Sequence, residues 1–184
     1  MDMPSILKNR MVSLFLVFFL LPSCGYHLSG SGDLVPKGAT TISIPVFING
    51  TDQPYVDIEI TQAVVREFLV DGRLDVANLD SADLALHGRV TAYEETALSY
   101  TAESYVQQYR VRLVVDVRLE DRRSKNIIWK EQGVEGIFIT DYPITYSPTN
   151  TVEITATKTA KEEAIRKASQ DLASTLRSRV LEGF

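Results

Sequence analysis

The segment YRVRLVVDVRL, residues 109–119, carries the clearest fold signal in the chain. Apolar side chains occupy every second position from Tyr109 to Leu119, and arginines and an aspartate fill most of the positions between them. Successive side chains of a β-strand point to opposite faces of a sheet, so this alternation predicts a strand with one buried face and one polar face. The fold is therefore expected to contain a sheet that is covered on one side.

Further strands are expected on both sides of this segment. Residues 84–92 place apolar or small side chains on one parity and predict a second long strand. Residues 127–138 follow a polar turn, and their poorer alternation indicates either a bulge or a strand with two differently covered faces. Residues 41–47 predict a first strand in which Pro45 marks an edge or a strand end, and residues 73–77 predict a short strand.

Two amphipathic helices complete the predicted fold. The first has an apolar residue at every fourth position from Val56 to Phe68 and ends at Asp71-Gly72. The second follows Asn150 or Thr151 as its cap, and its apolar stripe comprises Ile165, Ala168, Leu172, Leu176 and Val180. The expected fold class is α+β, with two helices packed on one face of a mixed, mainly antiparallel sheet of about four strands.

Composition excludes several classes of function. Hydrophobic residues make up 45% of the chain and charged residues 23%, which is typical of a globular protein. The formal net charge of −5 argues against a nucleic-acid-binding protein that relies on bulk positive charge. One cysteine and two histidines are too few for a zinc or iron–sulfur site, so no metal and no cofactor is expected. His27, His87 and the paired glutamates form no recognisable catalytic motif, so the chain is not expected to be an enzyme.

The first residues have the pattern of a bacterial export signal. Lys8 and Arg10 precede an apolar run over residues 11–21, which is shorter than the roughly 20 residues that a membrane-spanning helix needs. The alternative for this run is a buried N-terminal helix, although the run lacks the polar stripe expected of one.

Cys24 is the predicted lipid anchor. Leu21-Pro22-Ser23-Cys24 resembles a lipobox, in which the cysteine sulfur receives a diacylglycerol; an ordinary cleavage site beside a free thiol is the alternative. Gly25 is not the aspartate that resembles a retention signal for the inner membrane, so the expected location is the periplasmic face of the outer membrane. The expected organisation is a lipoprotein signal peptide over residues 1–23, a lipidated tether over residues 24–38 and a single α+β domain over residues 39–184.

Several short segments resemble the LptE type of lipopolysaccharide-assembly lipoprotein. They are CGYHLSG at 24–30, ISIPVFINGT at 42–51, VVREFL at 64–69, ADLALHGRV at 82–90, YRVRL at 109–113 and the Ala/Leu-rich last helix. The resemblance implies a non-enzymatic plug that sits inside an outer-membrane β-barrel, helps it assemble and assists lipopolysaccharide insertion into the outer leaflet. The implied partners are the barrel, lipopolysaccharide as a direct ligand, and the membrane through the acyl chains on Cys24, with no role for nucleic acid. The resemblance also implies two helices on a mixed four-stranded sheet.

One family feature has no counterpart in this sequence. The family's lipid contacts are attributed to basic residues at the hairpin tip before the long strand and in the loop before the last helix. Residues 90–109 and 131–157 contain no lysine or arginine, so no lipid-binding residue is transferred from the family pattern.

A regulator of a periplasmic cell-wall enzyme is the alternative function. Such regulators also combine a lipobox, a tether and an α+β domain, but they need a long linker to reach the cell wall. A flexible tether over residues 24–37 has a typical reach of roughly 20 Å, which favours a partner beside the membrane.

Three arginines are the candidate contacts with an anion or a partner. Arg89, Arg110 and Arg112 are expected on the sheet face that points away from the helices, together with Arg118. A hairpin tip near residues 99–101 would place Arg89 opposite Arg110 or Arg112, and opposed like charges destabilise a sheet. Two explanations stay open, which are neutralisation inside the chain by Asp116, Glu131 or Glu135, and contact with an anionic surface. That surface would be acidic residues of the barrel lumen or the phosphates of lipopolysaccharide.

Replacing Cys24 by alanine tests the lipid anchor. We expect the Cys24→Ala protein to keep its signal sequence as an unprocessed precursor, because the thiol is the acceptor of the lipid. The mass of the recovered protein measures this. A variant that is still cut between Ser23 and Cys24 and released in soluble form would show that the signal is an ordinary one.

Overall fold

The computed structural model describes residues 34–100, 106–140 and 151–183. The predicted signal peptide, Cys24, most of the tether and the cap residue Asn150 lie outside these ranges. In chain order the elements are β1 (Thr41–Ser43), β2 (Ile48–Asn49), α2 (Val56–Asp71), β3 (Asp75–Val76), β4 (Leu84–Tyr100), β5 (Val106–Asp121), β6 (Asn126–Thr140) and α3 (Thr151–Glu182).

The strands form one mixed sheet of six strands in the order β3-β1-β4-β5-β6, with β2 also paired to β4. The expectation of about four strands in a mainly antiparallel sheet is wrong. Strands β4, β5 and β6 are antiparallel neighbours, but the pairs β1–β3, β1–β4 and β2–β4 are parallel. Helix α2 connects the β1 segment to β3 and returns the chain to the end of the sheet at which β1 starts. Strand β3 therefore runs parallel to β1. The short strand predicted over residues 73–77 is confirmed as β3, whereas β2 spans only two residues and is too short for an alternating pattern to reveal it.

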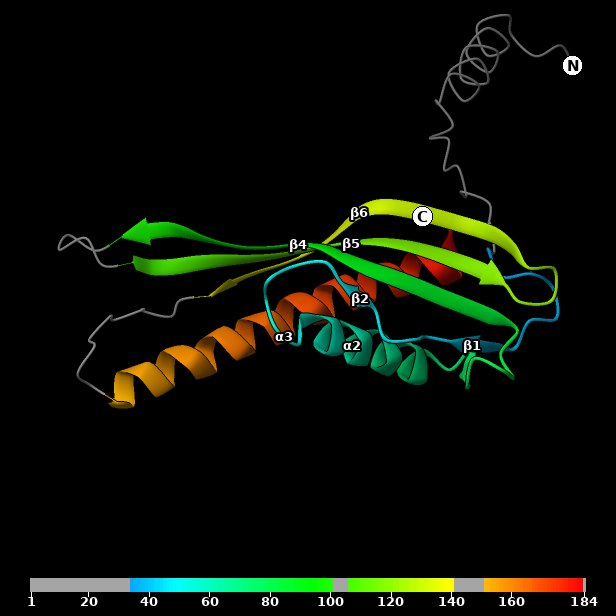
Figure 1. The fold of residues 1–184 in the computed structure, drawn as a ribbon, viewed down its shortest axis with the longest axis horizontal. Helices are drawn as coiled ribbons and strands as arrows, with labels where there is room; N and C mark the ends of the chain where they lie inside the picture. Colours follow the sequence, from blue (N-terminus) through cyan, green and yellow to red (C-terminus); the bar gives the residue numbers. More distant parts are fainter. Residues whose placement is uncertain (1–33, 101–105, 141–150, 184) are drawn as a thin grey trace, which may run out of the picture. The chain divides into compact units, whose positions relative to one another are not determined.

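Both helices cover the same face of the sheet, as the sequence predicts (Figure 1). Helix α2 ends where expected: Gly72 adopts φ 73°, and its N–H bonds to the carbonyl oxygen of Phe68 at 3.1 Å. No helix in the described ranges combines the length and the apolar character that crossing a bilayer requires. The predicted stripe of α3 is buried at all five positions, namely Ile165, Ala168, Leu172, Leu176 and Val180.

The central strand β5 supplies one wall of the core. Its predicted apolar positions Val111, Leu113, Val115, Val117 and Leu119 are all buried, and they join both helices in a single hydrophobic cluster. The alternation of residues 109–119 is thereby confirmed as the pattern of a strand with one covered face.

Two glycines allow other parts of the chain to approach the sheet closely. A Cβ atom on Gly88 of β4 would lie 2.2 Å from the ring of Phe47, and one on Gly136 of β6 would lie 2.3 Å from the backbone oxygen of Ala168 in α3. Both distances are far below van der Waals contact, so a side chain at either position would displace Phe47 or α3.

A bulge interrupts β6, which confirms one of the two explanations for its irregular pattern. The register between β5 and β6 shifts between Val115 and Val117, opposite a segment in which Gly133 adopts φ 70°. The Gly133 N–H donates to the Asp116 carboxylate at 3.0 Å. A second register shift, between Val90 and Ala92, affects the pairing of β4 with β5.

The predicted hairpin of β4 and β5 is present, but its predicted tip is wrong. Strand β4 continues to Tyr100 and β5 begins at Val106, so the connection falls later in the chain than residues 99–101. Arg89 therefore lies opposite Asp116, and Arg112 lies opposite Glu94. The first strand is also shorter than predicted, since β1 ends at Ser43, before Pro45.

Truncation of the core should destabilise the protein measurably. Leu113 and Leu172 are fully buried on β5 and α3. We expect Leu113→Ala and Leu172→Ala each to lower the free energy of unfolding by about 2–5 kcal/mol, because each change leaves a cavity in the core. Urea denaturation measures the change. Val70→Ala is the matched control, since Val70 is 86% exposed and its truncation should have little effect. Unchanged midpoints for both leucine variants would contradict the assigned core.

Candidate partner-binding face

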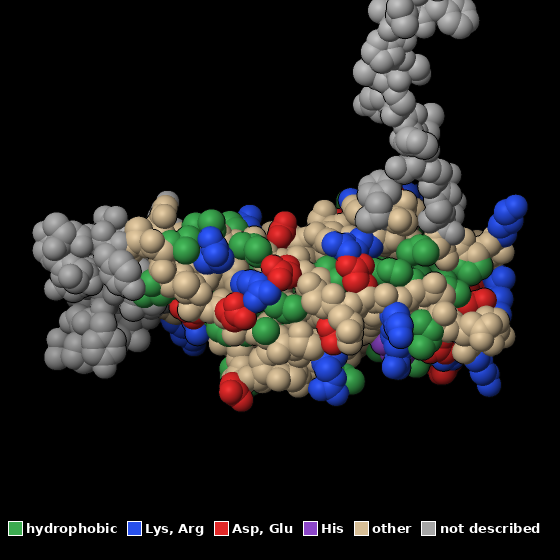
Figure 2. All heavy atoms as spheres, turned by 90° about the horizontal axis from the view of Figure 1, so that it is seen from above, with side chains coloured by type: hydrophobic (Ala, Val, Ile, Leu, Met, Phe, Trp, Pro, Cys, Tyr) green, Lys and Arg blue, Asp and Glu red, His purple; other side chains and the backbone are tan. Residues whose placement is uncertain are grey.

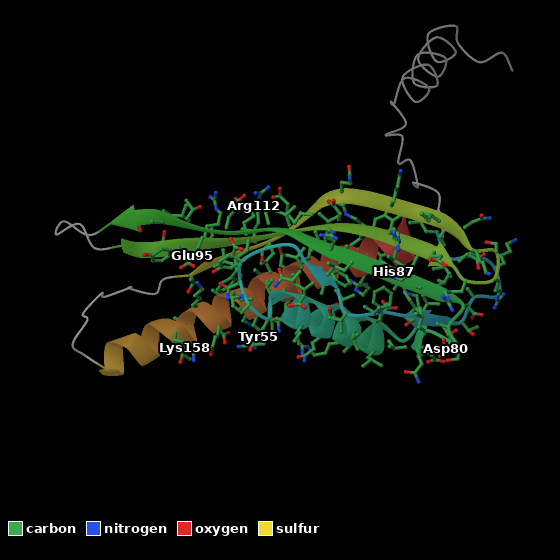
Figure 3. All side chains as sticks on the ribbon, viewed as in Figure 1. Tyr55, Asp80, His87, Glu95, Arg112 and Lys158 are labelled. Atoms are coloured by element: carbon green, nitrogen blue, oxygen red, sulfur yellow. The ribbon has the colours of Figure 1, made fainter. Side chains whose placement is uncertain are left out.

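The sheet face away from the helices is the candidate functional surface. In Figure 2 this face is seen from above, and lysine, arginine and acidic side chains lie among hydrophobic ones across it. The structure places the three arginines predicted as contacts on β4 and β5, with Arg89 and Arg110 exposed and Arg112 partly exposed. Figure 3 shows Arg112 on the side of the sheet opposite the helices.

Arg112 is neutralised within the sheet. Its guanidinium bonds to Glu94 of β4 at 2.8 Å and, through its other terminal nitrogen, to Glu135 of β6. The neighbouring guanidinium holds the pKa of the Glu135 carboxyl below its ordinary value. Of the carboxylates that the sequence offered as internal partners, Glu135 therefore serves Arg112.

Arg89 and Arg110 differ from Arg112 in their surroundings. Arg89 lies opposite Asp116 in the register of β4 and β5, and Arg110 lies opposite Thr96 and Ile139. Within the described ranges, no ion pair joins Arg89 or Arg110 to an acidic side chain. Glu131, another of the expected internal partners, instead pairs with Arg179 at the end of α3.

A row of nitrogen-bearing side chains crosses the three long strands. His87 of β4 lies opposite Arg118 of β5, and Arg118 lies opposite Lys130 of β6. We call these three residues the cation row. Sequence reasoning assigned Arg118 to this face but missed its proximity to Lys130, because the bulge of β6 sets that register. The row lines an open hollow of about 740 Å³, whose wall also includes Arg89, Asp116, Val46 and Ile48.

His87 is the neutral member of the cation row near pH 7. Its Nε2 atom lies 3.6 Å from a carboxylate oxygen of Glu120, and 28% of its side chain is exposed. Burial lowers the pKa of His87 below its ordinary value of 6.5, and the nearby charge of Arg118 lowers it further, although Glu120 acts in the opposite direction. The positive charge of the row therefore resides on Arg118 and Lys130.

A separate polar cluster around Asp83, which we call the Asp83 cluster, holds the first residues of the domain in place. The Asp83 carboxylate accepts hydrogen bonds from the backbone N–H groups of Thr40 and Thr41 at 2.8 and 3.2 Å and from Arg123 Nε at 2.9 Å. These donors hold the pKa of Asp83 well below its ordinary value. Arg123 also bonds to the carbonyl oxygen of Gly38 at 2.8 Å. These bonds thus fix Gly38, Thr40 and Thr41 beside the residues that begin β4.

Glutamates that are adjacent in the sequence also take part in ion pairs. Glu95 pairs with Lys161, and Glu162 and Glu163 pair with Lys158 and Arg166 on α3. In the part of the chain that the structure describes, no group of three or more His, Cys, Asp or Glu side chains is arranged to hold a metal ion. His27 and Cys24 lie outside that part.

The charge of Arg118 is expected to influence His87. Replacing Arg118 by glutamine should raise the pKa of His87, because removing a nearby positive charge favours the protonated imidazole. The pH dependence of the His87 ring signals in NMR spectra measures the change. Arg89→Gln is the control and should shift this pKa less, since Arg89 is not among the charges that act on His87. A pKa that stays constant or falls in Arg118→Gln would contradict the assigned geometry.

Comparison with solved structures gives matches at low sequence identity. A hypothetical protein from Chlamydia trachomatis is 13% identical, with a TM-score of 0.50, and the match covers 79% of this chain and 97% of the other. An uncharacterized lipoprotein B from Nitrosomonas europaea is 14% identical, with a TM-score of 0.47 and coverage of 84% and 91%. A minor lipoprotein from Acinetobacter baumannii is 15% identical, with a TM-score of 0.44 and coverage of 79% and 96%. At 13% identity the likeness to the Chlamydia protein concerns the fold alone.

The family is shown by a different comparison. The search of curated proteins found no match. A family model described as lipopolysaccharide-assembly matches residues 39–180. This range begins just before Thr40 and includes all six strands described above and nearly all of α3. The match agrees with the resemblance seen in the short sequence segments. The chain belongs to the LptE family of lipopolysaccharide-assembly proteins.

Proposed function

We propose that this protein is an outer-membrane lipoprotein that acts as the non-enzymatic plug subunit of the lipopolysaccharide-transport barrel. In this role it would help the barrel assemble and help insert lipopolysaccharide into the outer leaflet. The observation that carries the proposal is the family match over residues 39–180, which covers the folded domain almost completely. The lipobox-like sequence that ends at Cys24 supports the proposed attachment to a membrane.

The proposed anchoring keeps the domain close to its own membrane. Residues 1–23 would be removed as the signal peptide, and residues 24–38 would join the acylated Cys24 to the domain over residues 39–184. A flexible tether of this length reaches roughly 20 Å. The Asp83 cluster favours a short distance between membrane and domain. It holds Thr40 and Thr41 by hydrogen bonds, so these residues do not lengthen the flexible tether. A regulator of a cell-wall enzyme, the alternative function, would need a longer reach.

Direct contact with an anionic ligand is the second part of the proposal. Arg89 and Arg110 are exposed and have no ion pair within the described residues, so they are available to phosphate or carboxylate groups. Arg112 would have to exchange Glu94 and Glu135 for the ligand, which makes it the weaker candidate of the three. Lipopolysaccharide is the anionic ligand that the family role suggests.

Purification of the tagged, full-length lipoprotein from outer membranes tests the function. We expect one large, heat-modifiable β-barrel protein to co-purify in a constant ratio, because a plug inside a barrel has an extensive interface with it. The Cys24→Ala precursor is the control and should recover little barrel, since it would stay at the inner membrane. Recovery of a cell-wall enzyme without a barrel would instead support the alternative function.

A further inference from the structure

The cation row contains two like charges that no carboxylate among the described residues neutralises. Arg118 and Lys130 are directly opposite each other on neighbouring antiparallel strands, and both side chains are exposed. Like charges in this position destabilise a sheet. The formal net charge of the chain is −5, so this pair of cations is not the result of a generally basic composition.

The acidic side chains near Arg118 and Lys130 contact other groups. Glu131 pairs with Arg179, Asp116 accepts the N–H of Gly133, and Glu120 lies beside His87. Among the residues that the structure describes, no ion pair joins Arg118 or Lys130 to a carboxylate. The positive charge of the row is therefore directed at the solvent in front of the sheet.

The two charged members of the row set the spacing that an anionic ligand must match. Arg118 and Lys130 lie opposite each other on neighbouring strands, which are about 4.8 Å apart. Acidic side chains on one protein surface can face both charges, and so can a single phosphate, so the choice between them rests on the side chains beside the row. Arg118 can bind a carboxylate with two parallel hydrogen bonds, and Lys130 can act as a point charge beside it.

Apolar side chains beside the row favour a protein as the partner. Val46 and Ile48 border the same hollow and are 62% and 56% exposed. Exposed apolar side chains next to arginine, in a shallow hollow on a strand face, have the composition of a protein interface. The neighbouring residue Arg89 adds a third cation to the wall of the hollow.

We propose that the cation row, with Val46 and Ile48, is the surface on which an acidic protein partner docks, with carboxylates of the partner facing Arg118 and Lys130. The inference rests on the proposed function, so the partner surface is assigned to the inner wall of the barrel. Binding of carboxylates resolves the repulsion between Arg118 and Lys130. Such pairs chiefly determine the orientation of the docked protein and the rate at which it associates.

Carbodiimide cross-linking of the purified full-length complex tests this assignment. The reagent joins a lysine amine to a carboxylate only when the two groups are in contact. We expect a cross-linked peptide that connects Lys130 to an aspartate or glutamate of the barrel, identified by mass spectrometry. The Lys130→Arg variant keeps the charge but lacks the amine, so it should lose this cross-link and still recover the barrel.

Removal of the charges provides the second measurement. The double variant Arg118→Gln/Lys130→Gln should recover about tenfold less barrel at moderate salt, a loss that corresponds to about 1.4 kcal/mol. Its own unfolding midpoint should stay the same or rise, because the opposed charges are gone. Lys158→Gln is the matched control: Lys158 is 77% exposed on α3, and its change should leave barrel recovery unaltered.

Two outcomes would overturn the inference while the proposed function stands. One is equal recovery of the barrel by the wild-type chain and the double variant, with only intramolecular cross-links at Lys130. The other is normal barrel recovery by the double variant together with weaker binding to lipopolysaccharide micelles, which would assign the row to a lipid. If the wild-type chain recovers no barrel at all, both the proposed function and the inference that rests on it fail.

Discussion

Strand β5 buries one face and leaves the other open, and the rest of the structure follows from that division. The buried positions from Val111 to Leu119 remove apolar surface from water, which is the largest favourable contribution to folding. Both helices must then lie on the same side, because only that face offers them an apolar surface (Figure 1). The opposite face can only carry side chains that tolerate water or a partner. The candidate functional surface is thus a consequence of how the core is formed.

Close backbone approach and polar clusters complete the packing. Gly88 and Gly136 have no Cβ, so Phe47 can pack on β4 and α3 can pack directly on β6. At the end of α2, Asp71 accepts hydrogen bonds from Arg73 at 2.7 Å and from Arg177 of α3 at 3.2 Å. These guanidinium groups, Arg73 first, lower the pKa of Asp71 to about 2. This cluster joins the two helices, and the Asp83 cluster fixes the first strand to β4.

The open face contains two kinds of arginine. Arg112 is bound between Glu94 and Glu135 and contributes to the pairing of β4, β5 and β6. Arg118 is opposed by Lys130 instead and forms no ion pair with the described acidic side chains. A contact that destabilises the free chain is typical of a site that is completed by a binding partner, because the partner supplies the missing charge. The family role, association with the machinery of lipopolysaccharide assembly, offers such a partner in the proposed barrel.

The sequence by itself determined the elements with strong local periodicity. The alternation of residues 109–119 predicted β5 and its buried side, and the repeats that begin at Val56 and Ile165 predicted both helices and the face that each buries. Short segments such as CGYHLSG and ISIPVFINGT also identified the family. All of these signals depend on neighbouring residues along one chain segment.

Only the tertiary structure decided which strand positions oppose one another. Bulges at Val90–Ala92 and near Gly133 shift the register, so Arg89 meets Asp116, Arg112 meets Glu94, and Arg118 meets Lys130. Strand β2 was likewise invisible, because two residues form a strand only when a neighbouring strand supplies the hydrogen bonds.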